Sequence, residues 1–413
     1  MKSNIASNIP RYFVYTALKG FGFGLFMAVW VIYLQQQRGL SLSQAALIDV
    51  TFFVAAAFAE VPTGIVADRF GRKTSLTAGA ALMSLGILGW TFAPTLLLIM
   101  LAYVAMGVGI TFLSGAEDAF FYESLQVLGR GGGYSRLLGC VSAIFPGALA
   151  LGSVAGGLLA AIDVVLPFLM AGLVFLLTLG IVLTFKEPQT QEPSGAPARP
   201  SFGQVLRQSL TLLRARPTLR YPLLYLAIVP LASYILEIVF LQPQALALDV
   251  PLAGIGVIVM GAQLTAMLGS TWSDWVRARF GEGRVLYMAP LVICSSLIGL
   301  AALQVLPAML LIGVMGFVTA VVRPILLSRI QDELSDDIRA TMLSMQSLTF
   351  TLVVAMSQPS LGAIADHWGL PSAYVVLAAS VSLLMVCLFW KGRQHFPQAA
   401  MAASSSKVLK PLE

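Results

Sequence analysis

The chain has 413 residues, of which 58% are hydrophobic and only 11% are charged, and its mean hydropathy is +0.86. Because a soluble domain carries about a quarter charged residues, this composition excludes a soluble protein and indicates one that crosses a membrane many times. The formal net charge of +6 would suit nucleic acid binding, but the positions of the basic residues, given below, argue against it.

Twelve continuous apolar runs follow one another along the chain, separated by polar or Gly/Pro-containing stretches. Each run is long enough to cross the roughly 30 Å hydrocarbon core of a bilayer as a helix. We therefore expect an all-α, polytopic membrane protein with transmembrane helices over residues 12–35, 43–67, 74–92, 95–122, 137–161, 165–185, 219–243, 251–275, 285–304, 307–331, 340–364 and 371–390.

These runs fall into two sets of six, joined by one long connection that contains five prolines. Proline-rich polar segments of this kind are typical of linkers. The expected organisation is an N-terminal half over residues 1–185, a cytoplasmic linker over 186–217, a C-terminal half over 218–392 and a cytoplasmic tail over 393–413.

The basic residues are distributed unequally between the two sides of this map. Loops and span ends on one side hold 22 of the 25 Lys and Arg residues, and the positive-inside rule assigns that side to the cytoplasm. Both termini are therefore expected in the cytoplasm, with the protein in the cell membrane, the inner membrane of a bacterium. The basic residues set the membrane topology, and no nucleic acid partner is expected.

A charged motif joins the second and third runs, and it reads G-I-V-A-D-R-F-G-R-K from Gly64 to Lys73. It resembles the signature of the major facilitator superfamily, at the place where that family carries it. The resemblance implies a conformational gate that closes the cytoplasmic side, with Asp68 facing the positive N-terminus of a neighbouring helix. The gate residues expected here are Gly64, Asp68, Arg69, Gly71, Arg72 and Lys73.

A weaker copy of the motif follows the eighth run, where Gly269 and Asp274 are followed by Gly281. Two copies indicate two homologous halves. The resemblance then implies two pseudo-symmetric six-helix halves around a central cavity, and a secondary transporter that works by alternating access.

The fifth run carries a pattern of small residues that is similar to the antiporter motif of superfamily exporters. Four of six positions match, whereas Ala148 replaces a glycine and Ser153 replaces a proline. The alternative interpretation is ordinary packing of small residues between helices. The residues of this antiporter-like motif are Gly139, Ala148, Gly152, Ser153, Gly156 and Gly157.

Ionisable residues lie inside the predicted spans, where each is costly to keep. Four spans, the first, fourth, seventh and tenth, line the central cavity in the superfamily arrangement. The expected residues for proton coupling or for the substrate cavity are Lys19, Glu60, Glu117, Asp118, Glu237 and Arg323. Because Glu117 and Asp118 are about 100° apart on a helix, only one is expected to face the cavity. A structural lattice of ion pairs is the alternative.

Glycines alternate with phenylalanines in the first run, at Gly20, Gly22 and Gly24. The pattern does not follow a strand, so we interpret it as close helix packing or a flexible bend and not as a nucleotide site. No Walker A motif, metal spacing or nucleophile–base constellation is recognisable, so neither an enzyme nor a cofactor is expected.

The expected function is proton-coupled efflux of an amphipathic or hydrophobic compound by a monomer, with small-molecule substrate, protons and membrane lipid as its partners. Aromatic residues of the first run, Phe26, Trp30 and Tyr33, suit such a substrate. The alternative is proton-coupled uptake of a nutrient such as a sugar or an organic anion, for which Lys19 and Arg323 are suited. A receptor or scaffold without transport activity is the third possibility.

The topology yields a direct test. Single cysteines introduced at Ser201 and at Thr95 should react with a membrane-impermeant maleimide from opposite sides, with Ser201 cytoplasmic, because an odd number of spans separates them. Labelling of both positions from the same side would contradict the twelve-span map.

Overall fold

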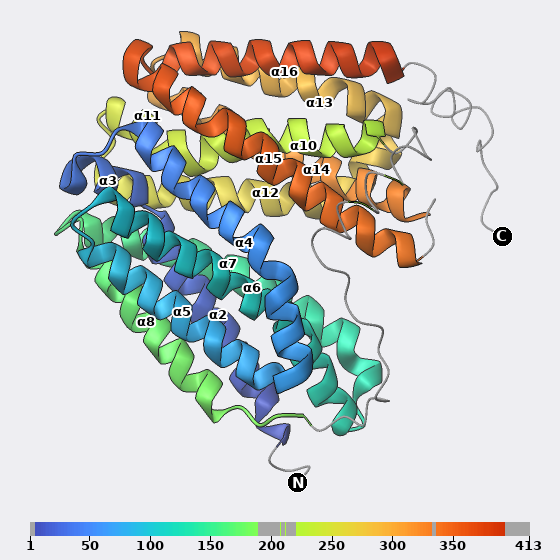
Figure 1. Cartoon of the computed structure of the whole chain (residues 1–413). Helices are drawn as coiled ribbons and strands as arrows, with labels where there is room; N and C mark the ends of the chain where they lie inside the picture. Colours follow the sequence, from blue (N-terminus) through green and yellow to red (C-terminus); the bar gives the residue numbers. More distant parts are fainter. Residues whose placement is uncertain (1–4, 189–206, 208–210, 212–219, 333–335, 393–413) are drawn as a thin grey trace. The chain divides into compact units, whose positions relative to one another are not determined.

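The computed structural model describes residues 5–188, 207, 211, 220–332 and 336–392 (Figure 1). Within these residues it contains helices and no strand, which confirms the all-α class. Most of the expected linker over 186–217 and the whole tail after residue 392 lie outside the described residues.

The chain divides into two compact units. Unit 1 comprises residues 1–202 and 249–260, and unit 2 comprises residues 203–248 and 261–413, so helix α12 contributes to both. The helices up to the linker are α2 (Asn8–Met27), α3 (Trp30–Arg38), α4 (Leu42–Phe70), α5 (Arg72–Phe92), α6 (Leu96–Val127), η1 (Gly131–Gly133), α7 (Tyr134–Ala160) and α8 (Leu166–Thr184).

The helices after the linker complete the chain. They are α10 (Arg220–Ile235), the π-helical segment η3 (Leu236–Phe240), α11 (Leu241–Ala247), α12 (Leu252–Phe280), α13 (Glu282–Ala302), η4 (Leu306–Met309), α14 (Leu310–Asp332), α15 (Asp336–Trp368) and α16 (Leu370–Gly392).

Eleven helical segments in the described part of the chain are long and apolar enough to cross a membrane, or twelve if α2 and α3 form one span. Those two helices meet at a bend of 44°, so the expected first span is broken after Met27. Gly39, in the left-handed conformation, ends α3, and a capping box between Ser41 and Gln44 begins α4.

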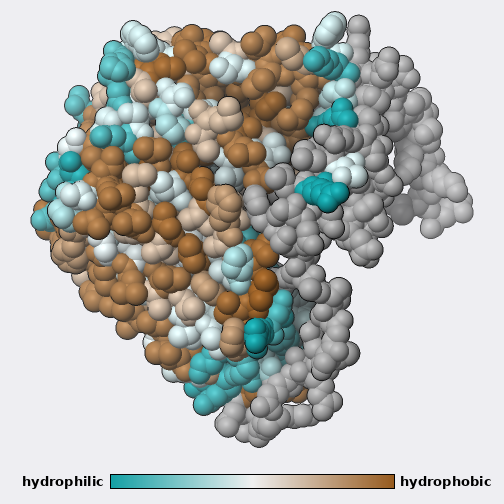
Figure 2. All heavy atoms as spheres, viewed as in Figure 1, coloured by the Kyte–Doolittle hydropathy of each residue, from teal (hydrophilic) through white to brown (hydrophobic). Residues whose placement is uncertain are grey.

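Large apolar side chains lie on the outside of both units. Figure 2 shows hydrophobic residues over much of the face in view, and Leu97, Leu151, Met356 and Leu383 are among those more than half exposed. Such a surface is unfavourable in water and favourable against lipid tails, which agrees with the composition.

The two units repeat one packing plan. In unit 1, α2 packs against α7 and α8, and α5 packs against α6 and α8. In unit 2, α10 packs against α15 and α16, and α13 packs against α14 and α16. Since α10 is the first long helix of its set, as α2 is of the other, the pairings correspond, as expected for pseudo-symmetric halves.

Glycine lets α2 and α7 approach closely. A Cβ atom on Gly24 would meet the Leu149 carbonyl oxygen of α7, and one on Gly152 would meet the Phe21 carbonyl oxygen of α2. The packing interpretation of the glycines in the first run is therefore correct for all three, since a Cβ on Gly22 would lie 2.9 Å from Phe175 of α8.

This contact should be sensitive to a single methyl group. We expect Gly24→Ala to lower the Tm of the purified protein, because the new Cβ meets backbone atoms that cannot move aside, at a cost of about 1–3 kcal/mol. Gly180→Ala is the matched control, because no atom lies within 4 Å of a Cβ at that helical position. Equal Tm values for the two variants would contradict the close approach.

Candidate functional site

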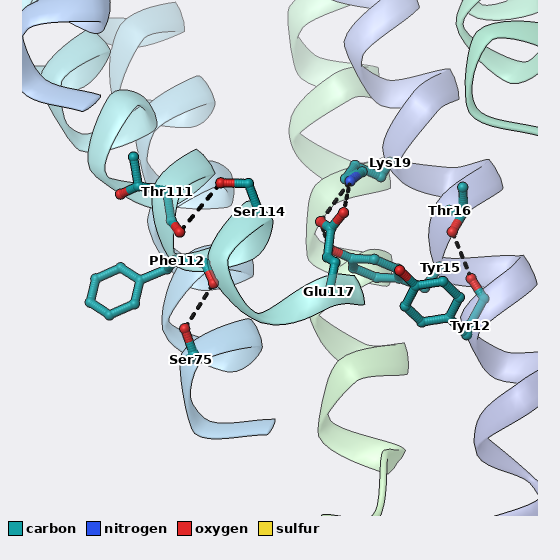
Figure 3. A network of polar contacts seen from close by, with 9 residues as sticks. All are labelled: Tyr12, Tyr15, Thr16, Lys19, Ser75, Thr111, Phe112, Ser114 and Glu117. Atoms are coloured by element: carbon teal, nitrogen blue, oxygen red, sulfur yellow. Dashed lines mark hydrogen bonds and ion pairs between the residues drawn. The ribbon is translucent and has the colours of Figure 1, made fainter. Parts of the chain in front are cut away.

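An ion pair joins the first and fourth long helices of unit 1. The Lys19 Nζ of α2 lies 2.6 Å from both carboxylate oxygens of Glu117 on α6. Figure 3 shows the two side chains pointing toward each other from their helices. Their side chains are only 10% and 16% exposed, so each charge needs the other to offset its loss of hydration.

A tyrosine hydroxyl completes this site. Tyr15 lies one turn before Lys19 on α2, is fully buried, and donates a hydrogen bond of 2.5 Å to Glu117 Oε1 (Figure 3). One carboxylate therefore accepts from an ammonium and from a phenol. The sequence reasoning missed Tyr15, although its spacing of four residues from Lys19 places both on the same face of α2.

Aromatic rings surround the ammonium group. Lys19 Nζ lies 5.2 Å from the ring centroid of Phe145 on α7 and 5.5 Å from that of Tyr15, both within cation–π range. The Cβ that Gly20 lacks would lie 2.5 Å from the Phe145 carbonyl oxygen. The close packing of α2 on α7 thus also places Phe145 beside Lys19.

The structure distinguishes the two adjacent acids of α6. Glu117 points toward α2 and binds Lys19, whereas Asp118 is exposed and has no hydrogen bond or ion pair to any described residue. The sequence left this choice open, because neighbouring positions differ by about 100° around a helix.

The other predicted ionisable residues do not join this pair. Glu60 on α4 and Arg323 on α14 are exposed, and no ion pair links either of them to a described acid or base. Glu237 lies in the π-helical segment η3 of unit 2. Of the six predicted residues, Lys19 and Glu117 are therefore the two that pair with each other in the described part of the chain.

The residues of the predicted gate form a second cluster in unit 1. Gly71, at φ +96°, makes the reversal between α4 and α5 that the motif requires. Arg72 Nη1 lies 2.6 Å from Asp68 Oδ1, and Arg72 Nε lies 3.2 Å from Glu123 Oε1 on α6. Arg72 thereby ties the ends of three helices together.

An acid that the sequence reasoning missed occupies the N-terminus of α5. The Glu187 carboxylate, just after α8, accepts the backbone N–H groups of Arg72 at 2.6 Å and Lys73 at 2.8 Å. Lys73 Nζ donates to the Leu183 carbonyl at 2.9 Å. The gate hypothesis places Asp68 opposite the N-terminus of a helix. At the N-terminus of α5, the carboxylate in that place belongs to Glu187.

The second motif copy has a related turn in unit 2. Gly281, at φ +82°, separates α12 from α13 as Gly71 separates α4 from α5. The ion pair across it joins Arg277 Nη2 to Glu282 Oε2 at 2.7 Å, so the basic residue precedes the glycine here. The Cβ that Gly269 lacks would meet the Phe317 carbonyl oxygen of α14, which makes it a packing residue.

The antiporter-like motif lies on α7. Gly152 and Gly156 contact the backbone of α2 at Phe21 and Leu25, whereas no atom lies within 4 Å of a Cβ at Gly139. Ser153 is buried and donates to its own helix at Leu149, 3.0 Å away. These contacts agree with the small-residue packing alternative, and Pro146 supplies the helix with a proline at another position.

Comparison with known proteins identifies the family. A sequence model of the Major Facilitator Superfamily matches residues 12–357. The chain belongs to the major facilitator superfamily.

Two relatives come from Bacillus subtilis (strain 168). The uncharacterized MFS-type transporter YxaM is 25% identical over 207 residues, which are 49% of this chain and 50% of YxaM. The uncharacterized MFS-type transporter YhjO is 29% identical over 199 residues, 48% of each chain. The chain therefore matches about half the length of these superfamily relatives.

Solved structures show the same superfamily fold. The nucleoside transporter NupG gives a TM-score of 0.77 at 12% identity, over 92% of this chain and 98% of NupG. A bacterial homologue of the human lysosomal transporter Spinster, inward-facing and unoccupied, gives 0.70 at 16% identity, over 96% and 98% of the two chains. At these identities the likeness concerns the fold alone.

The ion pair should be visible in stability. Lys19→Met and Glu117→Gln should each lower the Tm, because breaking a buried pair from one side costs about 3–5 kcal/mol when the other charge stays buried. The double variant Lys19→Met/Glu117→Gln should recover much of this loss, since no buried charge is left. Additive losses in the double variant would show that the two side chains do not interact.

Proposed function

We propose that this superfamily member is a secondary active transporter that exports an amphipathic or hydrophobic compound in exchange for protons. Membership of the superfamily supports transport, and the solved relatives with the same fold are transporters of several kinds. The observation that carries the coupling part is the partly buried Lys19–Glu117 pair with its Tyr15 hydrogen bond.

The pair is suited to exchange a proton with a conformational change. Glu117 cannot bind a proton and keep both contacts to Lys19, because both of its oxygens already accept from the ammonium group. An acid changes its affinity for protons when a neighbouring cation moves. A motion of α2 relative to α6 that separates the pair would therefore couple proton binding to opening and closing of the transporter.

The aromatic residues of the first run do not support the choice of substrate. Trp30 and Tyr33 are buried inside unit 1, where Tyr33 stacks on Trp90 at 4.8 Å and lies 4.4 Å from Phe168 between ring centroids. They are packing residues of the unit. The proposal of an amphipathic substrate rests on the Lys19–Glu117 pair being neutral as a whole.

The alternative, uptake of an organic anion, needs a free cation at the site. Lys19 is engaged by both oxygens of Glu117, so it becomes available to an anion only when Glu117 is protonated. That order would make protons and solute move in the same direction. Export by antiport requires opposite directions, so the direction of proton movement separates the two functions.

We also propose that the Asp68–Arg72–Glu123–Glu187 cluster serves as part of the gate. It joins the ends of α4, α5, α6 and the segment after α8 through charge-assisted hydrogen bonds. The cluster keeps these helix ends together and does not include α2, the helix that carries Lys19.

The function can be tested in proteoliposomes loaded with acidic buffer. Ethidium and Hoechst 33342, two amphipathic dyes, should accumulate inside as protons leave. Glu117→Gln should reduce accumulation to the level of empty liposomes, because the replacement amide does not take up a proton, while dye binding at fixed pH remains. Asp118→Asn, next to it but without a partner among the described residues, should keep full activity.

Two results would contradict this function. Full gradient-driven accumulation by Glu117→Gln would place the coupling acid elsewhere. Movement of a sugar or an organic anion, together with protons, into vesicles loaded with alkaline buffer, with no dye transport under either gradient, would favour the uptake alternative.

A further inference from the structure

Helices α13 and α16 of unit 2 pack side by side (Figure 1). Two contacts fix their register. The ring centroids of Tyr287 and Phe389 lie 4.5 Å apart, and Ser382 Oγ donates to Cys294 Sγ at 3.2 Å. The helices therefore run in opposite directions, and the first turns of α13 lie at the same end of the pair as the last turns of α16.

Two basic residues lie at this shared end. Arg284 is three residues before Tyr287 on α13. Lys391 is two residues after Phe389 on α16, so both basic residues lie within about one turn of the ring contact. Neighbouring helix axes are about 8–10 Å apart, a distance over which two long basic side chains can reach one anion.

Neither positive charge is compensated within the described part of the chain. The side chains of Arg284 and Lys391 are exposed, and no ion pair joins either of them to a described acid. Glu282, the acid at the start of α13, pairs with Arg277 of α12 at 2.7 Å. Arg284 and Lys391 are also the sole Lys or Arg residues of α13 and α16, so the positive charge of this pair is confined to one end.

Two aromatic residues with a polar group accompany the basic residues. Tyr287 and Trp390 are 46% and 74% exposed. Tyr and Trp are enriched where a membrane meets water, because the ring is favourable against lipid while the O–H or N–H group contacts the headgroups. This end of α13 and α16 therefore has the composition of a surface in the headgroup region.

Exposed apolar side chains continue from this end along both helices. Those more than half exposed are Met288 and Leu291 on α13, and Leu383 and Val386 on α16. Residues three and four apart share a helix face, so the first stripe begins at Arg284 and the second at Trp390. Such stripes are favourable against acyl chains and unfavourable in water.

The corresponding helices of unit 1 compensate their basic residues differently. By the shared packing plan, α5 and α8 correspond to α13 and α16. At the start of α5, Arg72 is paired with two acids and Lys73 donates to a backbone carbonyl. In unit 1 the protein itself supplies the partners, whereas Arg284 and Lys391 have no ion pair among the described residues and are open to an anion from outside the chain.

We propose that Arg284 and Lys391 bind the phosphate group of an anionic phospholipid, whose acyl chains lie along the apolar stripes of α13 and α16. Guanidinium and ammonium groups form strong charge-assisted hydrogen bonds with phosphate, and basic sites between transmembrane helices bind anionic headgroups. A free phosphate would match the charges and leave the stripes uncovered. An anionic phospholipid matches both features of the surface.

This lipid site is independent of the proposed transport function. It lies in unit 2 and uses neither the Lys19–Glu117 pair nor the gate cluster. Lipid binding is measured without a transport assay, so failure of one proposal does not decide the other.

The test uses the purified full-length protein in dodecyl maltoside, to which phosphatidylglycerol or phosphatidylcholine with the same acyl chains is added stepwise. A ligand that binds the folded state raises its apparent stability, so the Tm should rise and saturate with phosphatidylglycerol and rise less with phosphatidylcholine. Native mass spectrometry measures the phosphatidylglycerol that stays bound. Glycerol 1-phosphate, which has the phosphate without acyl chains, should leave the Tm unchanged.

Variants assign the effect to the two basic residues. Arg284→Gln and Lys391→Gln should each raise the phosphatidylglycerol concentration needed for half of the rise in Tm by about five-fold, the effect of one basic residue near an anionic surface. The double variant should lose both the rise and the bound lipid. Arg69→Gln is the matched control, because Arg69 is exposed at the end of α4 in unit 1 and has no ion pair with a described acid. It changes the net charge equally and should behave like the unmodified protein.

Three outcomes would overturn the proposal. The first is an equal rise in Tm with the two lipids, which would show a general effect of lipid. The second is an equal rise with glycerol 1-phosphate, which would show a site for free phosphate. The third is unchanged lipid binding in the double variant, or an equal loss in Arg69→Gln. Where the double variant does not fold, unchanged half-effect concentrations in both single variants have the same consequence.

Discussion

Close backbone contact between helices is the constraint on which the rest of this structure depends. Lipid tails are as apolar as leucine, so no hydrophobic force drives two transmembrane helices together, and packing must do so. On α2 and α7, the absent side chains of Gly24 and Gly152 bring backbone oxygens of the partner helix into direct contact. That approach also sets the ring of Phe145 beside the Lys19 ammonium group.

Buried charge is the second determinant, and the two units handle it differently. In unit 1, Glu117 is matched by Lys19 and Tyr15, and Arg72 is matched by Asp68 and Glu123. In unit 2, the Glu237 carboxylate lies against Gly316 of α14 and has no hydrogen bond or ion pair with any described residue. Acids within transmembrane spans are costly to keep, so each needs a compensating interaction or a function.

The repeated packing plan explains why the motif of the first half has a degenerate copy in the second. Gly71 and Gly281 both have positive φ, because each must reverse the chain between two long helices at the same place in its unit. The charges around the two turns are not preserved in order, since Arg72 follows its glycine while Arg277 precedes its own. The two turns therefore share a backbone conformation, although the ion pairs beside them are arranged differently.

The sequence by itself determined the all-helical class, most helix boundaries to within about five residues, and the candidate ionisable positions, because apolar length and charge within a span are local properties. Only the tertiary structure decided that Glu117 and not Asp118 binds Lys19, that Tyr15 joins them, and that Glu187 caps α5. It also showed that the first run breaks after Met27 and that a π-helical segment holds Glu237. These features depend on which helix faces which, and the hydrophobic pattern of a helix surrounded by lipid carries little information about its neighbours.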